Sequence, residues 1–381
     1  MAIDNKDKVL NVPNLRFPEF TEEWKKTKIG DITSKVGSVV TPKGGSAVYK
    51  TSGHLFIRSQ NVGNGCFLLD DVAYINEATH KKQINTELKD GDVLLNITGA
   101  SIGRTTVVNK NVEGGNVNQH VCIIRLLEDY SPNYICNYLL SYGGQKQIDS
   151  FQAGGNREGL NFEQIRSIKF SIPSFREQSK IASLLSLLEE RIATQNKIIE
   201  QLQSLIKGIV VSITAETPNA RIDKCLVCHS STLQENNIED FGDFPVYGAN
   251  GICGYTVNAD FNEPAILIVK DGSGVGNVRF VNGRYSVIGT QNILTPQNEI
   301  CLKYIFYCLQ AFNFVPYKTG MAIPHIYFKD YGKAKIYCPN FEQQVKIASQ
   351  IDLIESKIEI ATQLLNKYEE QKKFLLSNMF I

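Results

Sequence analysis

The side chains best suited to chemistry in this chain are hydrogen-bonding groups that lie beside glycine-rich segments. The candidates in the first half are Arg58, Gln60, Asn61, Ser101, Arg104, Asn118, Gln119, Asn156 and Arg157, and those in the second half are Tyr247, Asn250, Lys270, Ser273, Gln291, Asn292, Lys318 and His325. Arginine matches the edge of guanine, and asparagine or glutamine matches that of adenine, because each forms two hydrogen bonds. Singly, each is more often an ordinary surface residue, but their concentration beside flexible turns predicts contact with DNA.

Patterns that carry catalysis are missing from the sequence. There is no HExxH or deaminase motif, and the five histidines do not show metal-ligand spacing. Gly272–Gly276 follows an apolar segment as a nucleotide loop would, but no Lys-Ser or Lys-Thr pair ends it. Glu189 and Glu190 belong to a predicted helix, where we expect them on the solvated face. The sequence thus predicts no catalytic residue, no metal and no bound cofactor.

One short motif leaves an alternative open. Cys225, Cys228 and His229 form a CxxCH pattern, which in other proteins attaches haem or contributes to a zinc site. A fourth zinc ligand is not close in sequence, and the simpler interpretation is small buried residues on a short helix. A metal- or haem-binding protein therefore stays as one alternative.

Composition and charge restrict the class of protein. The chain has 381 residues, enough for two or three domains, and 43% of them are hydrophobic. Forty basic residues against 39 acidic ones exclude DNA binding through bulk charge, so any positive surface must be local or come from a partner. No apolar run approaches the roughly 20 residues of a membrane span. Nine cysteines without a signal sequence predict reduced thiols and a cytoplasmic location.

The chain repeats itself. The segment around Pro173 aligns without a gap to the segment around Pro339, with the sequence Lys-Ile-Ala-Ser in both, at an offset of 166 residues. Each copy opens with a proline and a capping pattern, in which Ser174 and Glu177 form a capping box and Asn340 with Gln343 is the weaker equivalent. Both copies therefore begin a helix.

Each predicted helix carries apolar residues that alternate by three and four, which indicates a coiled-coil seam. The seam positions include Ile181, Leu185, Leu188, Ile192, Ile199 and Leu202 in the first helix and Ile347, Ile351, Ile354 and Ile358 in the second. A helix from Ser174 to Ile213 would be about 60 Å long. Two such helices most simply pair with each other, in antiparallel fashion. Gln195 and Lys372 are the polar seam positions, and for Lys372 we favour fraying or a solvent-directed ammonium group.

The segments before the helices are predicted to be rich in strands. Gly91–Arg104 matches Glu263–Asn277, and Asn116–Ile124 matches Ile288–Pro296, but otherwise the two segments resemble each other only in outline. We expect an α+β fold of two mixed α/β domains separated by two long antiparallel helices. The predicted parts are residues 1–171 and 216–337 as recognition domains, with residues 172–215 and 338–381 as helices.

Two features resemble the specificity subunits of type I restriction–modification systems. One is the opening Pro13–Ile32, and the other is the pair of PxxEQxKIA-like segments before long helices. The second copy lacks a tryptophan at its start and has Gln343 in place of Glu177. The resemblance covers the whole chain.

This resemblance implies a subunit that supplies sequence recognition and no chemistry. Each domain would read one half of a bipartite target in double-stranded DNA, and the helices would set the spacer. Two methylation subunits would dock on the helices, restriction subunits would join the full complex, and S-adenosylmethionine and ATP would bind those partners. A second alternative is a coiled-coil interaction protein with β-rich ligand-binding domains. A third is a defective member of the family that has no working partner.

Overall fold

A computed structural model of the protein describes residues 11–38, 49–152, 159–238, 241–320 and 323–381. It divides into two compact units, of which unit 1 comprises Met1–Gln195 with Leu364–Ile381 and unit 2 comprises Asn196–Gln363. Each unit contains a globular part and segments of both long helices. We call the globular parts head 1 (residues up to 172) and head 2 (residues 216–338).

Head 1 is built from three small sheets covered by short helices. The four-stranded sheet has the order β2-β8-β5-β6, the three-stranded sheet β4-β3-β7, and the pair β1-β9 joins the two ends of the head. The strands are β1 Lys25–Lys28, β2 Thr33–Gly37, β3 His54–Ile57, β4 Ala73–Ile75, β5 Val93–Asn96, β6 Thr105–Val107, β7 Asn116–Val117, β8 Val121–Leu126 and β9 Lys169–Ile172. The helices are α1 Glu77–Lys82, α2 Pro132–Leu140, α3 Tyr142–Gln152 and α4 Phe162–Ser167.

Head 2 repeats this topology. Its sheets have the orders β11-β17-β14-β15, β13-β12-β16 and β10-β18, which correspond strand for strand to those of head 1. The strands are β10 Ala220–Arg221, β11 Leu226–Ser230, β12 Phe244–Gly248, β13 Gly251–Thr256, β14 Ala265–Val269, β15 Val278–Val281, β16 Ser286–Val287, β17 Gln291–Pro296 and β18 Lys335–Ile336. The helices are α6 Ile222–Cys225, α7 Leu302–Gln310 and α8 Phe328–Tyr331.

The heads are therefore more alike than their sequences indicate. The match of Gly91–Arg104 to Glu263–Asn277 agrees with the structure, since the strand and the glycine turn after it correspond. The second predicted match was shifted by two residues. Parallel pairing places Asn116 beside Phe56 and Ser286 beside Val246, so Asn116 corresponds to Ser286 and not to Ile288. The pairing of strands shows this alignment of the two heads, whereas the short polar sequences are too similar at neighbouring offsets to define it.

The two long helices are α5, Phe175–Ala215, and α9, Phe341–Asn378. At the start of α5 the Ser174 hydroxyl accepts a hydrogen bond from the Glu177 backbone N–H (3.4 Å), as predicted. The prediction that the Glu177 side chain completes the capping box was wrong. The Glu177 carboxylate is buried and instead accepts hydrogen bonds from Arg16 Nε (2.7 Å) and Nη2 (2.8 Å). Asn340 caps α9 by accepting from the Gln343 N–H at 2.9 Å.

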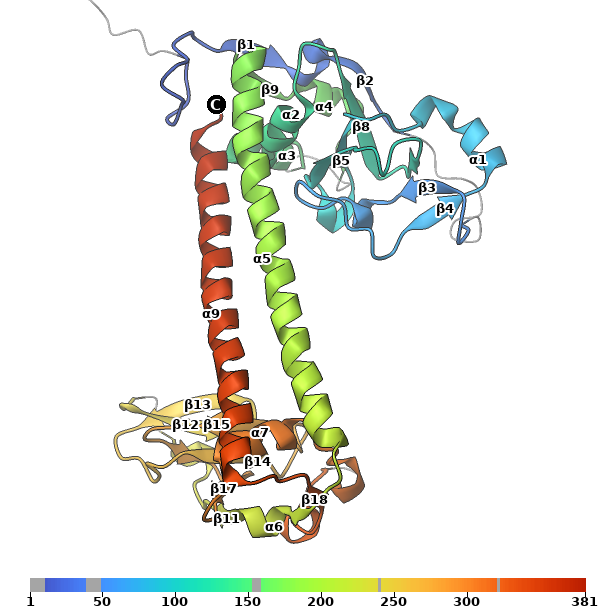
Figure 1. The fold of residues 1–381 in the computed structure, drawn as a ribbon. Coiled ribbons are helices and arrows are strands. Elements are labelled where there is room, and N and C mark those ends of the chain that lie inside the picture. The colour runs from blue at the N-terminus through green and yellow to red at the C-terminus, as the bar shows by residue number, and fades with distance from the viewer. Residues whose placement is uncertain (1–10, 39–48, 153–158, 239–240, 321–322) are drawn as a thin grey trace, which may run out of the picture. The chain divides into compact units, whose positions relative to one another are not determined.

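In unit 1 the first turns of α5 pack against the last turns of α9, so these segments run in opposite directions (Figure 1). Ile181, Leu185 and Leu188 are buried in the same core as Leu375 of α9 and Met379, which directly follows α9. In unit 2, Ile213 of α5 shares a core with Ala348 and Ile351 of α9. The other predicted seam positions, namely Ile192, Ile199, Leu202, Ile347, Ile354 and Ile358, are half-buried.

Polar groups on the seam have defined partners. Lys372 neither frays nor points to solvent, because its Nζ lies 2.9 Å from Glu189 Oε1 and its side chain is largely buried. The prediction that Glu189 lies on the solvated face was also wrong, because its side chain is partly buried and pairs with Lys372. Gln195 is buried between the helices, and Arg191 lies over the Tyr368 ring at 5.9 Å. These contacts fix how α5 and α9 pair inside unit 1.

The expectation that no apolar run approaches a membrane span was too strong. Helix α5 contains an 18-residue window that is long and apolar enough to cross a membrane by length and composition. A single helix of this kind is weak support for a span, and α5 contributes apolar residues to the cores of both units.

Candidate DNA interface

Four segments of head 1 meet at one edge, which we call recognition edge 1. They are the end of β3, the turn after β5, the link between β7 and β8, and the residues before α4. Backbone hydrogen bonds join the link to β3 (Asn118 N to Ile57 O, 2.9 Å) and the turn to the link (Ile97 N to His120 O, 3.0 Å). Leu160 N donates to Ile97 O at 2.9 Å and brings in the last segment.

Head 2 forms the same edge, recognition edge 2, through equivalent bonds. Ile288 N donates to Tyr247 O at 3.0 Å, and Lys270 N donates to Thr290 O at 2.9 Å. Ile326 N donates to Lys270 O at 2.9 Å, as Leu160 does to Ile97. The parallel pairs β3–β7 and β12–β16 explain this arrangement, because both strands of a parallel pair end at the same side of the sheet. Sequence-distant candidates are thereby brought together.

The glycine turns have the same backbone form in both heads. Gly99 and Gly272 have φ values of +69° and +97°, and Gly103 and Gly276 have values of +87° and +91°. These values lie in the left-handed region that glycine adopts without strain. A Cβ on Gly99 or Gly272 would meet no atom within 4 Å, so the turns present open backbone. Both segments therefore serve as tight backbone turns at the edge.

Several predicted residues of head 1 are accessible at this edge. Arg58, Ser101 and Arg104 are half-exposed, and Gln60 and Gln119 are exposed. Asp71 holds two of them, since its Oδ1 lies 3.1 Å from Arg58 Nη2 and its Oδ2 accepts from Gln60 Nε2 at 2.7 Å. Asn156 and Arg157 lie outside the described residues.

Four other predicted residues are used inside the fold. Asn61 accepts from the Arg58 N–H and donates to the carbonyls of Leu68 and Asp71, and Asn118 Oδ1 accepts from the His120 N–H. Gln291 donates to Tyr247 O at 3.1 Å, and Asn292 donates to Tyr331 Oη at 2.9 Å. All four are buried, and this geometry favours a structural role: they fix the backbone of the edges.

Recognition edge 2 presents lysine and histidine side chains. Lys270, Tyr247 and His325 are half-exposed, and Asn250, Ser273 and Lys318 are exposed. The segment from Lys318 to His325, which we call the lysine loop, contains a pair of backbone hydrogen bonds of 2.9 and 2.8 Å between Thr319 and His325. This loop places a lysine and an imidazole beside the glycine turn, a composition suited to phosphate contact.

Further groups at the two edges are exposed or half-exposed, although the sequence patterns did not indicate them. Tyr327 is 47% exposed, with Lys329 Nζ over its ring at 5.1 Å and the His325 ring at 5.1 Å. Arg279 lies over the Tyr247 ring at 5.9 Å. Thr98 is a further such group, and its hydroxyl is bonded to His120, a candidate from the sequence, in edge 1. Tyr327 and Lys329 could have been identified as candidates from the sequence, because they directly follow the segment Lys318–His325.

The residues of the CxxCH motif are divided between two elements. Cys225 ends α6, whereas Cys228 and His229 follow on strand β11, so the expectation of one short helix was wrong. His229 Nε2 lies 2.9 Å from Thr295 Oγ1. Within the part of the chain that the structure describes, no three metal-ligating side chains gather.

Comparison with known proteins decides the family. Residues 21–204 and 227–370 match the family model for the type I restriction modification DNA specificity domain. The chain belongs to this family of type I restriction–modification specificity subunits. It is 21% identical to the MjaX type I restriction enzyme specificity subunit of Methanocaldococcus jannaschii, over 96% of this chain and 95% of that one.

Other specificity subunits are similar too. The Escherichia coli EcoprrI specificity subunit is 27% identical over 29% of this chain and 27% of its own. The fold matches the crystal structure of the S subunit from M. genitalium with a TM-score of 0.65, at 16% identity, over 97% of this chain and 99% of that one. A second structure, of a type I restriction–modification system, matches with a TM-score of 0.56 at 13% identity, over 93% of this chain and 96% of that one. The protein is thus a DNA specificity subunit, and the interaction-protein alternative is not favoured.

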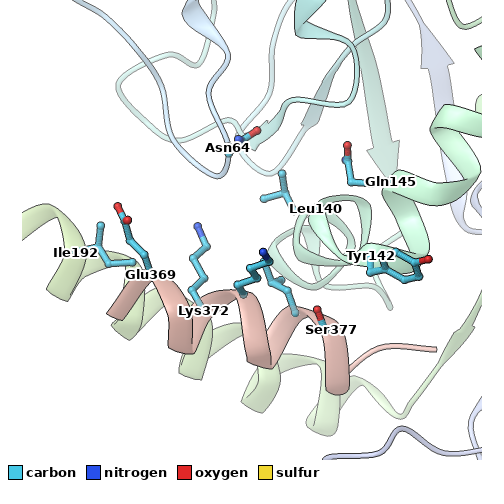
Figure 2. Close-up of a pocket in the computed structure, with 10 residues that line it drawn as sticks. Asn64, Leu140, Tyr142, Gln145, Ile192, Glu369, Lys372 and Ser377 are labelled. Carbon is cyan, nitrogen blue, oxygen red and sulfur yellow. The ribbon is translucent and has the colours of Figure 1, made fainter. Parts of the chain in front are cut away.

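This specificity subunit also has a cavity of about 610 Å³ in unit 1, where head 1 meets the helices. Figure 2 shows Asn64, Leu140 and Gln145 of the head on one side and Glu369, Lys372 and Ser377 of α9 on the other. A Cβ on Gly65 would lie 2.6 Å from Glu189 Oε1, so the head approaches α5 closely beside this cavity. The cavity belongs to the junction of head and scaffold and is formed by residues other than those of recognition edge 1.

Proposed function

We propose that each recognition edge of this specificity subunit reads one half of a bipartite target in double-stranded DNA. The observation that carries the proposal is the duplicated edge: four equivalent segments, joined by equivalent backbone hydrogen bonds, present different side chains in the two heads. Two edges with the same backbone arrangement and different side chains are suited to reading two different half-sites. Glutamine, arginine and histidine dominate edge 1, whereas lysine, tyrosine and histidine dominate edge 2.

The DNA-contacting residues in this proposal are the accessible ones. They are Arg58, Gln60, Ser101, Arg104 and Gln119 in head 1 and Tyr247, Asn250, Lys270, Ser273, Lys318 and His325 in head 2, joined by Tyr327 and Lys329. Since the chain is nearly neutral overall, partner subunits would contribute further phosphate contacts.

We propose further that two methylation subunits dock on the helices, one in each unit. Two apolar positions are exposed in both repeats at the same offset of 166 residues, with the two members of each pair in different units. The pairs are Phe175 with Phe341 and Leu187 with Leu353. Leu187 and Leu353 are each 59% exposed. Solvent-exposed apolar side chains at equivalent positions of the two repeats are suited to binding two copies of the same partner.

The rest of the assembly follows the family. In this proposal S-adenosylmethionine binds the methylation subunits, which methylate adenine, while ATP binds restriction subunits that join the full complex in the cytoplasm. The specificity subunit itself contributes residues 1–171 and 216–337 for recognition. The helical residues 172–215 and 338–381 set the spacer between half-sites.

A methylome tests this function. The chain is expressed with its methylation subunit in a host that lacks such systems, and modified adenines are mapped by long-read sequencing. We expect one two-part motif with a fixed gap. Exchange of residues 216–337 for a different head should change one half-site and leave the other, with the same partner. Absence of a new motif from a soluble, assembled complex would contradict the proposal.

A further inference from the structure

We propose that Arg279 reads a guanine in the half-site of head 2, and that Tyr247 positions its guanidinium group. The inference rests on the proposed function, because it assigns one base contact to recognition edge 2. Arg279 lies on β15, where it pairs with the buried Leu267 of β14, and its side chain is half-exposed. The sequence patterns did not indicate it.

The guanidinium group of Arg279 lies at the end of β12 that belongs to recognition edge 2. Its Cζ lies over the Tyr247 ring, 5.9 Å from the ring centroid. A Cβ on Gly251 would lie 3.5 Å from Nη2 and 3.7 Å from Nη1, so the group also lies beside the turn that joins β12 to β13. Because residue 251 has no side chain, it does not cover the guanidinium.

The Tyr247 ring is supported by a buried aromatic cluster. Tyr247 makes an edge contact with Tyr285, with 5.9 Å between the ring centroids, and Tyr285 stacks on Phe261 at 5.7 Å. Tyr285 is itself buried, and its hydroxyl donates to the Glu263 carbonyl at 3.0 Å. A cation over an aromatic face is attracted to it. The supported ring therefore restricts the positions that the guanidinium of Arg279 can take.

The hydrogen-bonding groups of Arg279 are available to a ligand. Among the residues that the structure describes, no carboxylate pairs with Arg279, and no protein acceptor binds its side-chain N–H groups. By contrast, Arg125 of head 1 donates from Nε and Nη2 to Asp92, at 2.7 Å each. Arg279 is thus a cation that contacts an aromatic ring and a glycine and keeps its donors for DNA.

These donors match the edge of guanine. Guanine presents two acceptors, O6 and N7, in the major groove, whereas adenine presents the acceptor N7 beside the donor N6. A guanidinium has only donors, so it can bind both atoms of guanine but meets another donor on adenine. A phosphate contact needs charge without a fixed direction, which the exposed Lys318 can supply. A guanidinium restricted by an aromatic ring is therefore suited to the base.

Head 1 has no equivalent of this arginine. Gly103 and Gly276 correspond, so Thr106, three residues on, corresponds to Arg279. The strand pairing agrees, because Leu94 pairs with Thr106 as Leu267 pairs with Arg279. Thr106 is buried and carries no charge. The guanine contact is thus specific to head 2, and a change to it should leave the half-site of head 1 intact.

The methylome of variants in complex with the methylation subunit tests the inference. For Arg279→Ala we expect one G·C position to become degenerate in the half-site of head 2, with discrimination there lower by roughly ten-fold or more. Tyr247→Leu removes the ring face and should weaken discrimination at the same position, whereas Tyr247→Phe keeps the face and should preserve it. Arg284→Ala is the matched control, because Arg284 lies over the Phe244 ring, at the other end of β12. It should leave the motif unchanged.

A modified base distinguishes the guanine edge from the phosphate backbone. In a synthetic duplex that carries the methylated motif, 7-deazaguanine replaces the guanine at the affected position and removes only the N7 acceptor. The affinity of the unaltered complex should fall by roughly ten-fold. The Arg279→Ala complex should bind both duplexes equally, because it no longer contacts N7.

The outcomes separate this inference from the proposed function. If the unaltered protein yields no bipartite motif, the proposed function itself fails. If it yields one and Arg279→Ala keeps every position, relaxes an A·T pair or alters the half-site of head 1, the inference alone is wrong. Equal affinity of the unaltered complex for the two duplexes would also refute it and would assign Arg279 to phosphate.

Two further results complete the test. If Tyr247→Leu alters only a different position, Tyr247 does not position Arg279. Continued methylation of the original motif in each variant shows that the complex is folded. Where a variant methylates nothing, the two duplexes decide, since they are compared with the unaltered complex.

Discussion

Gln178 and Gln344 make the same pair of hydrogen bonds in the two units, although 166 residues separate them. Gln178 Oε1 accepts from the Ser131 N–H at 3.0 Å and its Nε2 donates to Pro173 O at 3.0 Å. Gln344 Oε1 accepts from the Cys301 N–H at 2.9 Å and its Nε2 donates to Pro339 O at 2.8 Å. Ser131 and Cys301 cap α2 and α7, so each glutamine joins a head helix to the start of a long helix.

Replacing either glutamine should destabilise its own unit. Gln344→Leu leaves the Cys301 N–H and the Pro339 carbonyl without their partner. We expect a loss of about 2 kcal/mol, and a melting temperature lower by roughly 4–8 °C. Gln343→Ala is the matched control, since its side chain is exposed one residue away, and it should change stability by less than about 0.5 kcal/mol. Equal effects of the two substitutions, measured by calorimetry, would refute the bridging role.

The ion pair between Arg16 and Glu177 should be costly to break from one side. Glu177 is buried, and its hydrogen bond raises the pKa of Arg16, so Arg16→Met leaves an isolated carboxylate. We expect a loss of about 3 kcal/mol in denaturant unfolding. The double variant Arg16→Met, Glu177→Gln removes the charge as well and should recover part of that loss. A double variant as unstable as the sum of the single ones would contradict this account.

Docking of two methylation subunits should depend on the duplicated leucines. Leu187→Glu and Leu353→Glu each place a charge in one proposed docking surface, so each should change a 2:1 complex to 1:1 in native mass spectrometry. The double variant should bind neither copy. Val211→Glu is a suitable control, because Val211 is at least as exposed as the leucines but its equivalent position is Ser377. A 2:1 complex with the double variant would place the docking surface elsewhere.

The lysine loop of head 2 should contribute charge more than base discrimination. Lys318→Ala removes one exposed cation at recognition edge 2. DNA affinity of the methylation complex should fall by a similar factor on all sequences, and the slope of log affinity against log salt should decrease by about one. The methylated motif should stay the same. Loss of a base preference instead would identify Lys318 as a base reader.

Buried thiols should make the protein sensitive to alkali. Burial raises the pKa of Cys122 and Cys136 to about 12, whereas an unfolded thiol titrates near about 8.5. The folded state keeps protons that the unfolded state loses, so their contribution to stability is complete below the unfolded pKa and is lost as pH rises toward 12. Melting temperatures should fall from pH 9 to pH 11. The pair Cys122→Ala, Cys136→Ala should flatten that slope, and an unchanged slope would assign it to other groups.

The sequence by itself determined the long helices, their repeat and the family. The three-and-four spacing of apolar residues and the proline before each copy are local patterns, and local patterns set where a helix begins. They placed the first helix at Ser174–Ile213, and the structure has α5 at Phe175–Ala215. The strand–glycine-turn match between the heads was also readable, because backbone with positive φ demands glycine.

Only the tertiary structure decided which polar residues face outward. Asn61, Asn118, Gln291 and Asn292 have the same side-chain chemistry as base readers, yet they satisfy buried backbone groups. Glu177 has the position of a capping residue, but Arg16, distant in sequence, takes its carboxylate. Residue type and spacing do not specify such partners, since long-range pairing of strands and segments chooses among several possible hydrogen bonds. The likeness of the two heads was hidden for the same reason: it lies in strand order, and strand order is fixed by contacts between residues far apart in the chain.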